Sequence, residues 1–155
     1  MANWGYPLVK RIPMIKSDMT PFPYSIDIHA PLTRARDLVV EHGIRYLPVT
    51  EDSEPVGVLV DAQINQALDP RFSNPSVPEL CVEDAHILPS HIVELSEPLD
   101  NVLIHMASNH LDCALVVKQG KLVGIFTVYD VCKSYGETLR AQFSVATTDN
   151  GDDAA

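Results

Sequence analysis

The chain has 155 residues, of which 46% are hydrophobic, which suits one ordinary domain or two small units that share a core. Eleven basic and twenty-one acidic residues give a formal net charge of −10, which argues against nucleic acid or an anionic membrane surface as a partner. Three widely spaced cysteines without a CxxC pair, and no apolar run near the ~20 residues that span a bilayer, favour a soluble protein in the reducing cytoplasm.

The first half of the chain predicts a short extended segment, a helix, two strands and a second helix, in that order. One face of the first helix carries four apolar residues: Leu32, Ala35, Leu38 and Val39. Gly43 is expected to end this helix. Apolar runs at 46–49 and 56–60, separated by a polar turn at 51–55, predict a hairpin. A helix over 61–68 closes the unit.

The second half predicts the same order of elements. Its first helix again has one apolar face, formed by Leu99, Val102, Leu103 and Met106. Both first helices are expected to carry a proline in the first turn, Pro31 or Pro98. Strands over 113–117 and 122–127 and a helix over 128–142 complete the unit.

The two halves repeat each other at an offset of 67 residues. The matches need no gap and pair Pro31 with Pro98, Leu32 with Leu99, Val49 with Val116, Val56 with Val123 and Gly57 with Gly124. We expect the two glycines to lie where a backbone passes close by. Two copies of a unit too small to bury its own apolar face pack on each other, which creates grooves between them.

This periodicity divides the chain into four parts. We expect a first repeat over 12–68, a linker over 69–78, a second repeat over 79–141 and a disordered acidic tail over 142–155. The fold class is therefore α+β, with two β-α-β-β-α repeats about a pseudo-two-fold axis.

Several short sequence motifs, called words below, resemble those of the CBS domain. This domain is named after cystathionine β-synthase and occurs in tandem pairs called Bateman modules. The words are DMTP at 18–21, HGIRYLPV at 42–49, PVGVL at 55–59, VED at 82–84 and LVGIFTVYD at 122–130. The resemblance covers residues 12–141. It implies a non-catalytic module, often a homodimer, that binds an adenosine-containing ligand such as AMP, ADP, ATP or S-adenosylmethionine.

The resemblance also implies a binding word of Gly, two apolar residues, Ser or Thr, two variable residues and Asp. The second repeat has this word as Gly124, Thr127 and Asp130. The first repeat has Val60 in place of the hydroxyl and Gln63 in place of the carboxylate. Because a carboxylate grips a ribose diol through charge-assisted hydrogen bonds and an amide oxygen does not, we expect one competent site per chain.

Other lining residues follow from the resemblance alone. The adenine is expected to lie against the start of the second repeat and its first long strand, namely Ile87, Asp112, Cys113 and Ala114. Arg45 is placed to reach a phosphate across the groove, and its counterpart at the 67-residue offset is the oppositely charged Asp112.

Structural interpretations compete with these assignments. Thr127 and Asp130 have the spacing of a capping box, a role compatible with ligand binding. Arg45 also fits a solvated charge at the end of a strand. The six histidines lack metal-ligand spacing, and the chain contains no GxSxG word, P-loop or dinucleotide-binding glycine pattern, so we expect neither a metal site nor catalysis.

The sequence thus predicts a regulatory, cytoplasmic homodimer that requires no cofactor, binds an adenine nucleotide and acts on an effector protein of unknown identity. The alternative is a scaffolding dimer with vestigial nucleotide sites, suggested by the altered word in the first repeat. An enzyme is the third and least favoured class.

Overall fold

The computed structural model describes residues 10–72 and 79–143 of the chain. The predicted acidic tail lies outside the described residues except for its first two positions, as do residues 73–78 of the predicted linker.

Both repeats contain the predicted order of elements. The first half of the chain holds η1 (Ile15–Ser17), β1 (Thr20–Pro21), β2 (Ile26–Asp27), α1 (Leu32–His42), β3 (Leu47–Glu51), β4 (Glu54–Leu59) and α2 (Asp61–Leu68). The second half holds η2 (Val82–Asp84), β5 (His91–Glu94), α3 (Leu99–Ser108), β6 (Cys113–Lys118), β7 (Lys121–Thr127) and α4 (Val128–Phe143). The α+β fold class and the β-α-β-β-α repeat are therefore confirmed.

The first helix of each repeat forms where its apolar spacing places it. In α1 the buried residues are Leu32, Ala35 and Val39, and in α3 they are Leu99, Val102 and Met106. Gly43 ends α1 in the left-handed conformation, with φ of 60°, as predicted. The proline prediction was wrong by one position, because Pro31 and Pro98 precede their helices as the capping residues.

Each repeat contains a tight hairpin. The turn between β3 and β4 has positive φ at Asp52 (50°) and Ser53 (67°), and the turn between β6 and β7 has positive φ at Gln119 (52°) and Gly120 (78°). Two consecutive positive φ values are those of a type I′ turn, whose twist matches that of the flanking strands. Both hairpins also contain a register shift at the same repeat position, after Val49 and after Val116.

The described strands form a three-stranded sheet in the order β2-β3-β4 and a four-stranded sheet in the order β1-β7-β6-β5. Strand β2 pairs parallel with β3, and β5 pairs parallel with β6 in the same way. Strand β1 belongs to the first half of the chain but pairs antiparallel with β7 of the second. A strand from the first half of the chain thus forms one edge of the sheet that contains the strands of the second half.

The exchange involves residues 12–21 and 79–88, which we call the leading segments. The backbone N–H of Ile15 donates to Glu97 O at 2.9 Å, and the N–H of Val82 donates to Ala30 O at the same distance. Leu88 forms a bridge with Val58, which is the counterpart of β1 on β7. Each leading segment therefore crosses to the other repeat, and the 67-residue offset relates the two crossings.

The leading segments also contribute buried side chains to the core of the other repeat. The core of the first repeat contains Val82 and Ala85 from the second leading segment, and the core of the second repeat contains Ile15 from the first. A third buried cluster joins the two sheets at their seam and consists of Val58, Cys113, Leu115 and Ile125. The repeats therefore fold as one body, since each completes the apolar core of the other.

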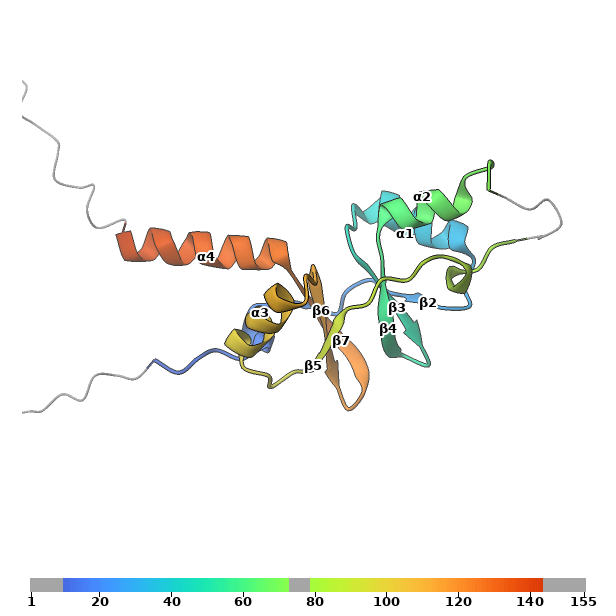
Figure 1. Ribbon diagram of the computed structural model, residues 1–155. Coiled ribbons are helices and arrows are strands. Elements are labelled where there is room, and N and C mark those ends of the chain that lie inside the picture. The colour runs from blue at the N-terminus through green and yellow to red at the C-terminus, as the bar shows by residue number, and fades with distance from the viewer. Residues whose placement is uncertain (1–9, 73–78, 144–155) are drawn as a thin grey trace, which may run out of the picture.

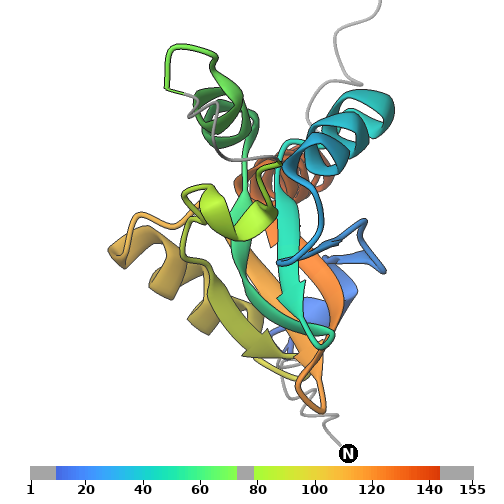
Figure 2. The same cartoon turned by 90° about the vertical axis from the view of Figure 1, so that its right-hand side faces the viewer.

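Figure 1 shows the sheets in the middle of the molecule, with α1 and α2 beyond one sheet and α3 beyond the other. Figure 2, turned by 90°, shows β3 and β4 in front of β6 and β7. Helix α4 extends away from the body and has no buried residue (Figure 1). None of the helices in the described part of the chain is both long enough and apolar enough to span a membrane.

Candidate functional site

Strand β7 ends at Thr127 and α4 begins at the next residue, which places the side chains of the predicted binding word at a helix start. The backbone N–H of Thr127 donates to Asp130 Oδ2 at 2.7 Å, and its hydroxyl donates to the same oxygen at 3.0 Å. Asp130 therefore caps α4, as its spacing suggested. Within the described residues the second carboxylate oxygen, Oδ1, accepts no hydrogen bond, so the cap leaves it available to a ligand.

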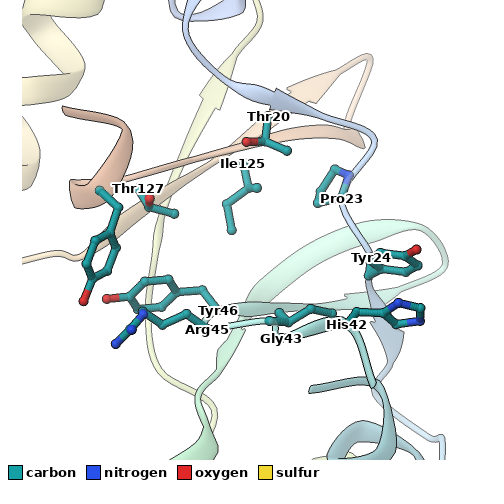
Figure 3. A pocket seen from close by; sticks show the side chains of 11 residues that line it. Thr20, Pro23, Tyr24, His42, Gly43, Arg45, Tyr46, Ile125 and Thr127 are labelled. Carbon is teal, nitrogen blue, oxygen red and sulfur yellow. The ribbon is translucent and has the colours of Figure 1, made fainter. Parts of the chain in front are cut away.

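A cavity of about 400 Å³ lies beside Thr127, and we call it the tyrosine cavity. Its lining comes from β1 and the residues after it, from the end of α1 through the start of β3, and from β7 and α4: Thr20, Pro23, Tyr24, His42, Gly43, Ile44, Arg45, Tyr46, Ile125, Thr127 and Tyr129. In Figure 3, Arg45 and Tyr46 lie on one side, with Thr20, Ile125 and Thr127 on the other. The cavity is thus built from both repeats, and its volume is within the range of small-molecule sites.

Aromatic rings and one guanidinium give this cavity its chemistry. The Arg45 guanidinium carbon lies 4.7 Å from the centroid of the Tyr129 ring, within range of a cation–π contact. The Tyr46 and Tyr129 rings are 6.4 Å apart at 42°, and the Tyr24 ring stacks on His42 at 4.0 Å. Arg45 is therefore held over a ring at the cavity wall. Such a lining can receive a flat apolar group next to an anion.

A second hollow of about 310 Å³, the Asp130 cavity, is also lined by Thr20. Asp130 and Lys133 of α4 line it together with residues 17–21 of the first leading segment. Thr20 lines both cavities, so the hydroxyl of Thr127 and the carboxylate of Asp130 face neighbouring hollows.

A third cavity, of about 670 Å³, shares the lining residues Gly43, Ile44, Arg45 and Tyr46 with the tyrosine cavity. Asp61 at the start of α2 and Asp112 just before β6 contribute carboxylates, and we call it the acidic cavity. Val60 stands there at the position equivalent to Thr127.

Burial and neighbouring charge alter the acidity of two groups between these cavities. Burial, and next the negative charge of Asp112, raise the pKa of Tyr46 above its ordinary value. The same two causes, in the same order, raise the pKa of the Cys113 thiol to about 12. Cys113 is 2% exposed, so the thiol is protonated and inert at neutral pH.

The structure brings some of the expected site residues together and separates others. Thr127 and Arg45 line the tyrosine cavity, and Asp130 lines the cavity beside it. Gly124 is buried beneath the side chain of Met19, with which an added Cβ would overlap. The predicted close approach at the glycines is thereby confirmed, because a Cβ on Gly57 would lie 2.6 Å from the Leu88 carbonyl oxygen.

The remaining expected residues lie elsewhere. Ile87 packs against Gly57 of the first repeat. Asp112 and Cys113 line a small cavity of about 130 Å³ that Leu88 also lines. Ala114 is fully buried in the core of the second repeat. The expected set is therefore not one pocket, because the second leading segment crosses to the first repeat and lines the opposite groove.

Sequence reasoning missed Thr20, Tyr24, His42, Tyr46 and Tyr129 as lining residues. Two features could have indicated them. Thr20 of the DMTP word is equivalent to Ile87 at the 67-residue offset, and the glycines require a close backbone neighbour. If the leading segments exchange, the segment that approaches Gly124 comes from the first half.

Among residues 10–72 and 79–143, the structure contains no group of three His, Cys, Asp or Glu side chains that could hold a metal ion. Cys81, Cys113 and Cys132 are free thiols.

Known proteins share this fold. The family model for the CBS domain matches residues 9–69 and 82–137. No curated protein matches the chain. Among solved structures, the putative acetoin utilization protein AcuB from Vibrio cholerae superposes with a TM-score of 0.70 at 22% identity, covering 85% of this chain and 96% of that one.

Two other similar structures contain ligands. The CBS domain pair of protein MJ0100, in complex with 5′-methylthioadenosine and S-adenosyl-L-methionine, has a TM-score of 0.65 at 22% identity and covers 80% of this chain and 100% of its own. The protein CBSX2 in complex with AMP has a TM-score of 0.66 at 20% identity, with 82% and 99% covered. Since the family model matches both repeats over most of the chain, this protein belongs to the CBS domain family, as a tandem pair.

Proposed function

We propose that this protein is a non-catalytic regulatory module that binds an adenosine-containing ligand in the tyrosine cavity. The observation that carries the proposal is the meeting of Thr127, Arg45 and the ring of Tyr129 at one cavity between the repeats. Complexes of the similar CBS proteins with AMP, 5′-methylthioadenosine and S-adenosylmethionine support this ligand class.

The cavity lining suits each part of such a ligand. Tyrosine rings and Ile125 provide the apolar surface that a purine needs. The hydroxyl of Thr127 lines this cavity, and Asp130, which lines the neighbouring hollow, is proposed to offer its free oxygen to the ribose diol in charge-assisted hydrogen bonds. Arg45 and the amino end of α4 favour a phosphate locally, despite the negative net charge of the chain.

Calorimetry with AMP, ADP, ATP and S-adenosylmethionine tests the proposal. Asp130→Ala should weaken binding at least tenfold, because hydrogen bonds to a charged group are worth about 1.5–3 kcal/mol. Gln63→Ala changes the equivalent position of the first repeat and is the matched control, which should bind like the wild type. Equal affinity in both variants and the wild type would remove Asp130 from the site.

We further propose that ligand occupancy is passed to an effector protein in the cytoplasm, and that nucleic acid and membranes are not partners. The formal net charge of −10 supports the second part, since it repels phosphate backbones and anionic lipids. The boundaries at 12–68 and 79–141 remain our proposal for the two repeats.

A scaffolding homodimer is the second candidate function. It is favoured by α4, which has no buried residue and exposes Tyr135, Leu139 and Phe143. A ligand that binds only the native state must raise the melting temperature. An unchanged melting temperature with every adenine nucleotide at millimolar concentration would favour the scaffold over the sensor.

A further inference from the structure

Two histidine rings meet where β5 packs against α3. The ring of His91, the first residue of β5, stacks on the ring of His105, with 3.8 Å between the centroids and 18° between the planes. His105 belongs to the last turn of α3. We call this pair the histidine clamp. Neither ring lines the cavities described above, so the proposed function leaves the pair without a role.

The histidine clamp lies at the edge of the apolar core of the second repeat. On β5, Val93 follows His91 by two residues and belongs to this core. On α3, the core residues Val102 and Met106 flank His105. Alternate side chains of a strand point to the same side, so His91 faces α3 together with Val93. Because His91 is partly buried and burial penalises a charge, this position favours a neutral ring.

Few charges near the clamp offset a second proton. Burial, and next the positive charge of His105, lower the pKa of His91 below its ordinary value, whereas Glu97 acts in the opposite direction. The carboxylate of Glu97 accepts a hydrogen bond of 3.2 Å from Asn101 Nδ2. On β6, the residue opposite His91 is the uncharged Ala114. When one ring carries a proton, the next proton therefore meets a like charge, with a single carboxylate to balance it.

The first repeat does not contain this pair. The 67-residue offset places Tyr24 at the position of His91 and Leu38 at the position of His105. Histidine is the side chain that ordinarily changes its charge between about pH 5 and 8. A response of these positions to mild acid is therefore confined to the second repeat.

The start of α3 also holds the first leading segment. The backbone N–H of Leu99 donates to Pro13 O at 2.9 Å, and the N–H of Ile15 donates to Glu97 O at the same distance. The side chain of Ile15 is fully buried in the core of the second repeat. A displacement of α3 would therefore loosen the first leading segment as well.

We propose that the histidine clamp is a pH-sensitive device, which holds α3 against β5 while both rings are neutral and releases α3 and the first leading segment when both are protonated. In mild acid, repulsion between two imidazolium rings replaces the stacking of two neutral rings. The clamp acts without a ligand, so it does not depend on the proposed function.

NMR titration of the histidine side chains and hydrogen exchange of the backbone amides test the clamp between pH 4.5 and 7.5. In the wild type, the protection factors of α3 and of Ile15 should fall about fivefold on protonation, as expected for two unit charges about 4 Å apart in water. The free energy of unfolding should decrease as the pH falls below about 6.5. A lowered pKa in the folded state means that the unfolded chain binds more protons in this range.

His105→Phe keeps a ring at this position and removes the charge, and His105 is exposed, so the substitution leaves the core intact. This variant should raise the pKa of His91 and keep the protection of α3 throughout the pH range. His105→Ala removes the ring and should lower the protection of α3 at neutral pH as well. His42→Phe is the matched control. His42 stacks on the uncharged ring of Tyr24 at 4.0 Å, so its replacement should leave the titration of His91 unchanged.

Two results overturn the proposal. One is protection of α3 that does not change when His91 and His105 are protonated, because the clamp would then hold in both charge states. The other is a titration of His91 that is the same in the wild type and in His105→Phe, because the two rings would then not share their charges.

Discussion

The side chain of Asp130 has a structural role that can be separated from its proposed role in binding. Its carboxylate accepts hydrogen bonds from the backbone N–H and the hydroxyl of Thr127 at the start of α4. Asp130→Ala removes this cap and should lower the free energy of unfolding by about 1 kcal/mol. Asp130→Asn keeps an acceptor oxygen and should lose less than half of that.

Urea unfolding of the two variants measures the difference. Asp130→Asn should still bind adenine nucleotides poorly, since the charge that grips the ribose diol is gone. Equal losses of stability in both variants would show that the cap does not depend on the acceptor oxygen.

The Cys113 thiol should make stability fall as the pH rises. Burial, followed by the charge of Asp112, raises its pKa from 9.0 to about 12 in the folded protein. Between these two values the unfolded chain loses the thiol proton and the folded chain keeps it, so the folded state binds more protons. The free energy of unfolding should therefore decrease by about 1 kcal/mol per pH unit above pH 9.

Denaturant unfolding between pH 8 and 11, compared with Cys113→Val, isolates this contribution. The valine variant has no proton to lose at this position and should show a shallower slope over the same range. Parallel slopes in the two proteins would contradict the raised pKa.

Cys132 on α4 is exposed and should react first with a thiol reagent.

At the scale of elements, Gly57 and Gly124 lie under the leading segments at equivalent positions of the two repeats. They should differ in how well they tolerate a larger side chain. An added Cβ at Gly57 would meet the Leu88 carbonyl oxygen at 2.6 Å, and this oxygen is fixed by its hydrogen bond from Val58 N. An added Cβ at Gly124 would meet the flexible side chain of Met19.

Gly57→Ala should therefore lower the free energy of unfolding by about 2 kcal/mol, within the usual cost of overpacking, and Gly124→Ala by clearly less. Thermal or urea unfolding of the two variants measures the difference. If Gly124→Ala is the more destabilising substitution, then Met19 is held more rigidly than the second leading segment.

The elements themselves were predictable because the information for them is local. Glycine readily adopts the left-handed conformation that ends a helix, so Gly43 indicated the end of α1. The polar residues at 51–55 indicated a tight turn. The crossing of the leading segments was not predictable in this way. Ile15 and Val82 are equivalent by the 67-residue offset, and nothing local determines which core each enters.

The candidate site was predicted in part for the same reason. Thr127 and Asp130 belong to one contiguous word, so their proximity follows from the start of a helix. Ile87 and Asp112 were grouped with them from the resemblance alone, whereas Ile87 lies on the leading segment that crosses to Gly57, and Asp112 lines the acidic cavity. A repeat offset gives equivalence between positions but does not give their contacts.

At the scale of the whole molecule, the pseudo-two-fold axis yields two grooves that share a wall and differ in charge. Arg45 and Asp112 are equivalent by the 67-residue offset, and both line the acidic cavity. Arg45 also lines the tyrosine cavity, so an anion bound there would draw on the same cation. By linkage, any such coupling must be reciprocal between the two cavities.

We expect helix α4 to provide the surface for the proposed homodimer. Tyr135, Leu139 and Phe143 are spaced four residues apart, lie on one face and are 63%, 37% and 67% exposed. Helix α4 projects from the body of the molecule (Figure 1), and the same apolar face of a second copy could pack against this face around a two-fold axis.

Leu139→Glu should convert the dimer into a monomer in sedimentation velocity at micromolar concentration, because two carboxylates would be buried without partners at the contact. The circular dichroism of the variant should match that of the wild type, since Leu139 contributes no buried side chain to the core of its own chain. Phe22→Glu, at a position 84% exposed in the first half of the chain, is the control and should remain dimeric. A dimeric Leu139→Glu protein would place the contact on another surface, and a monomeric wild type would remove the dimer itself.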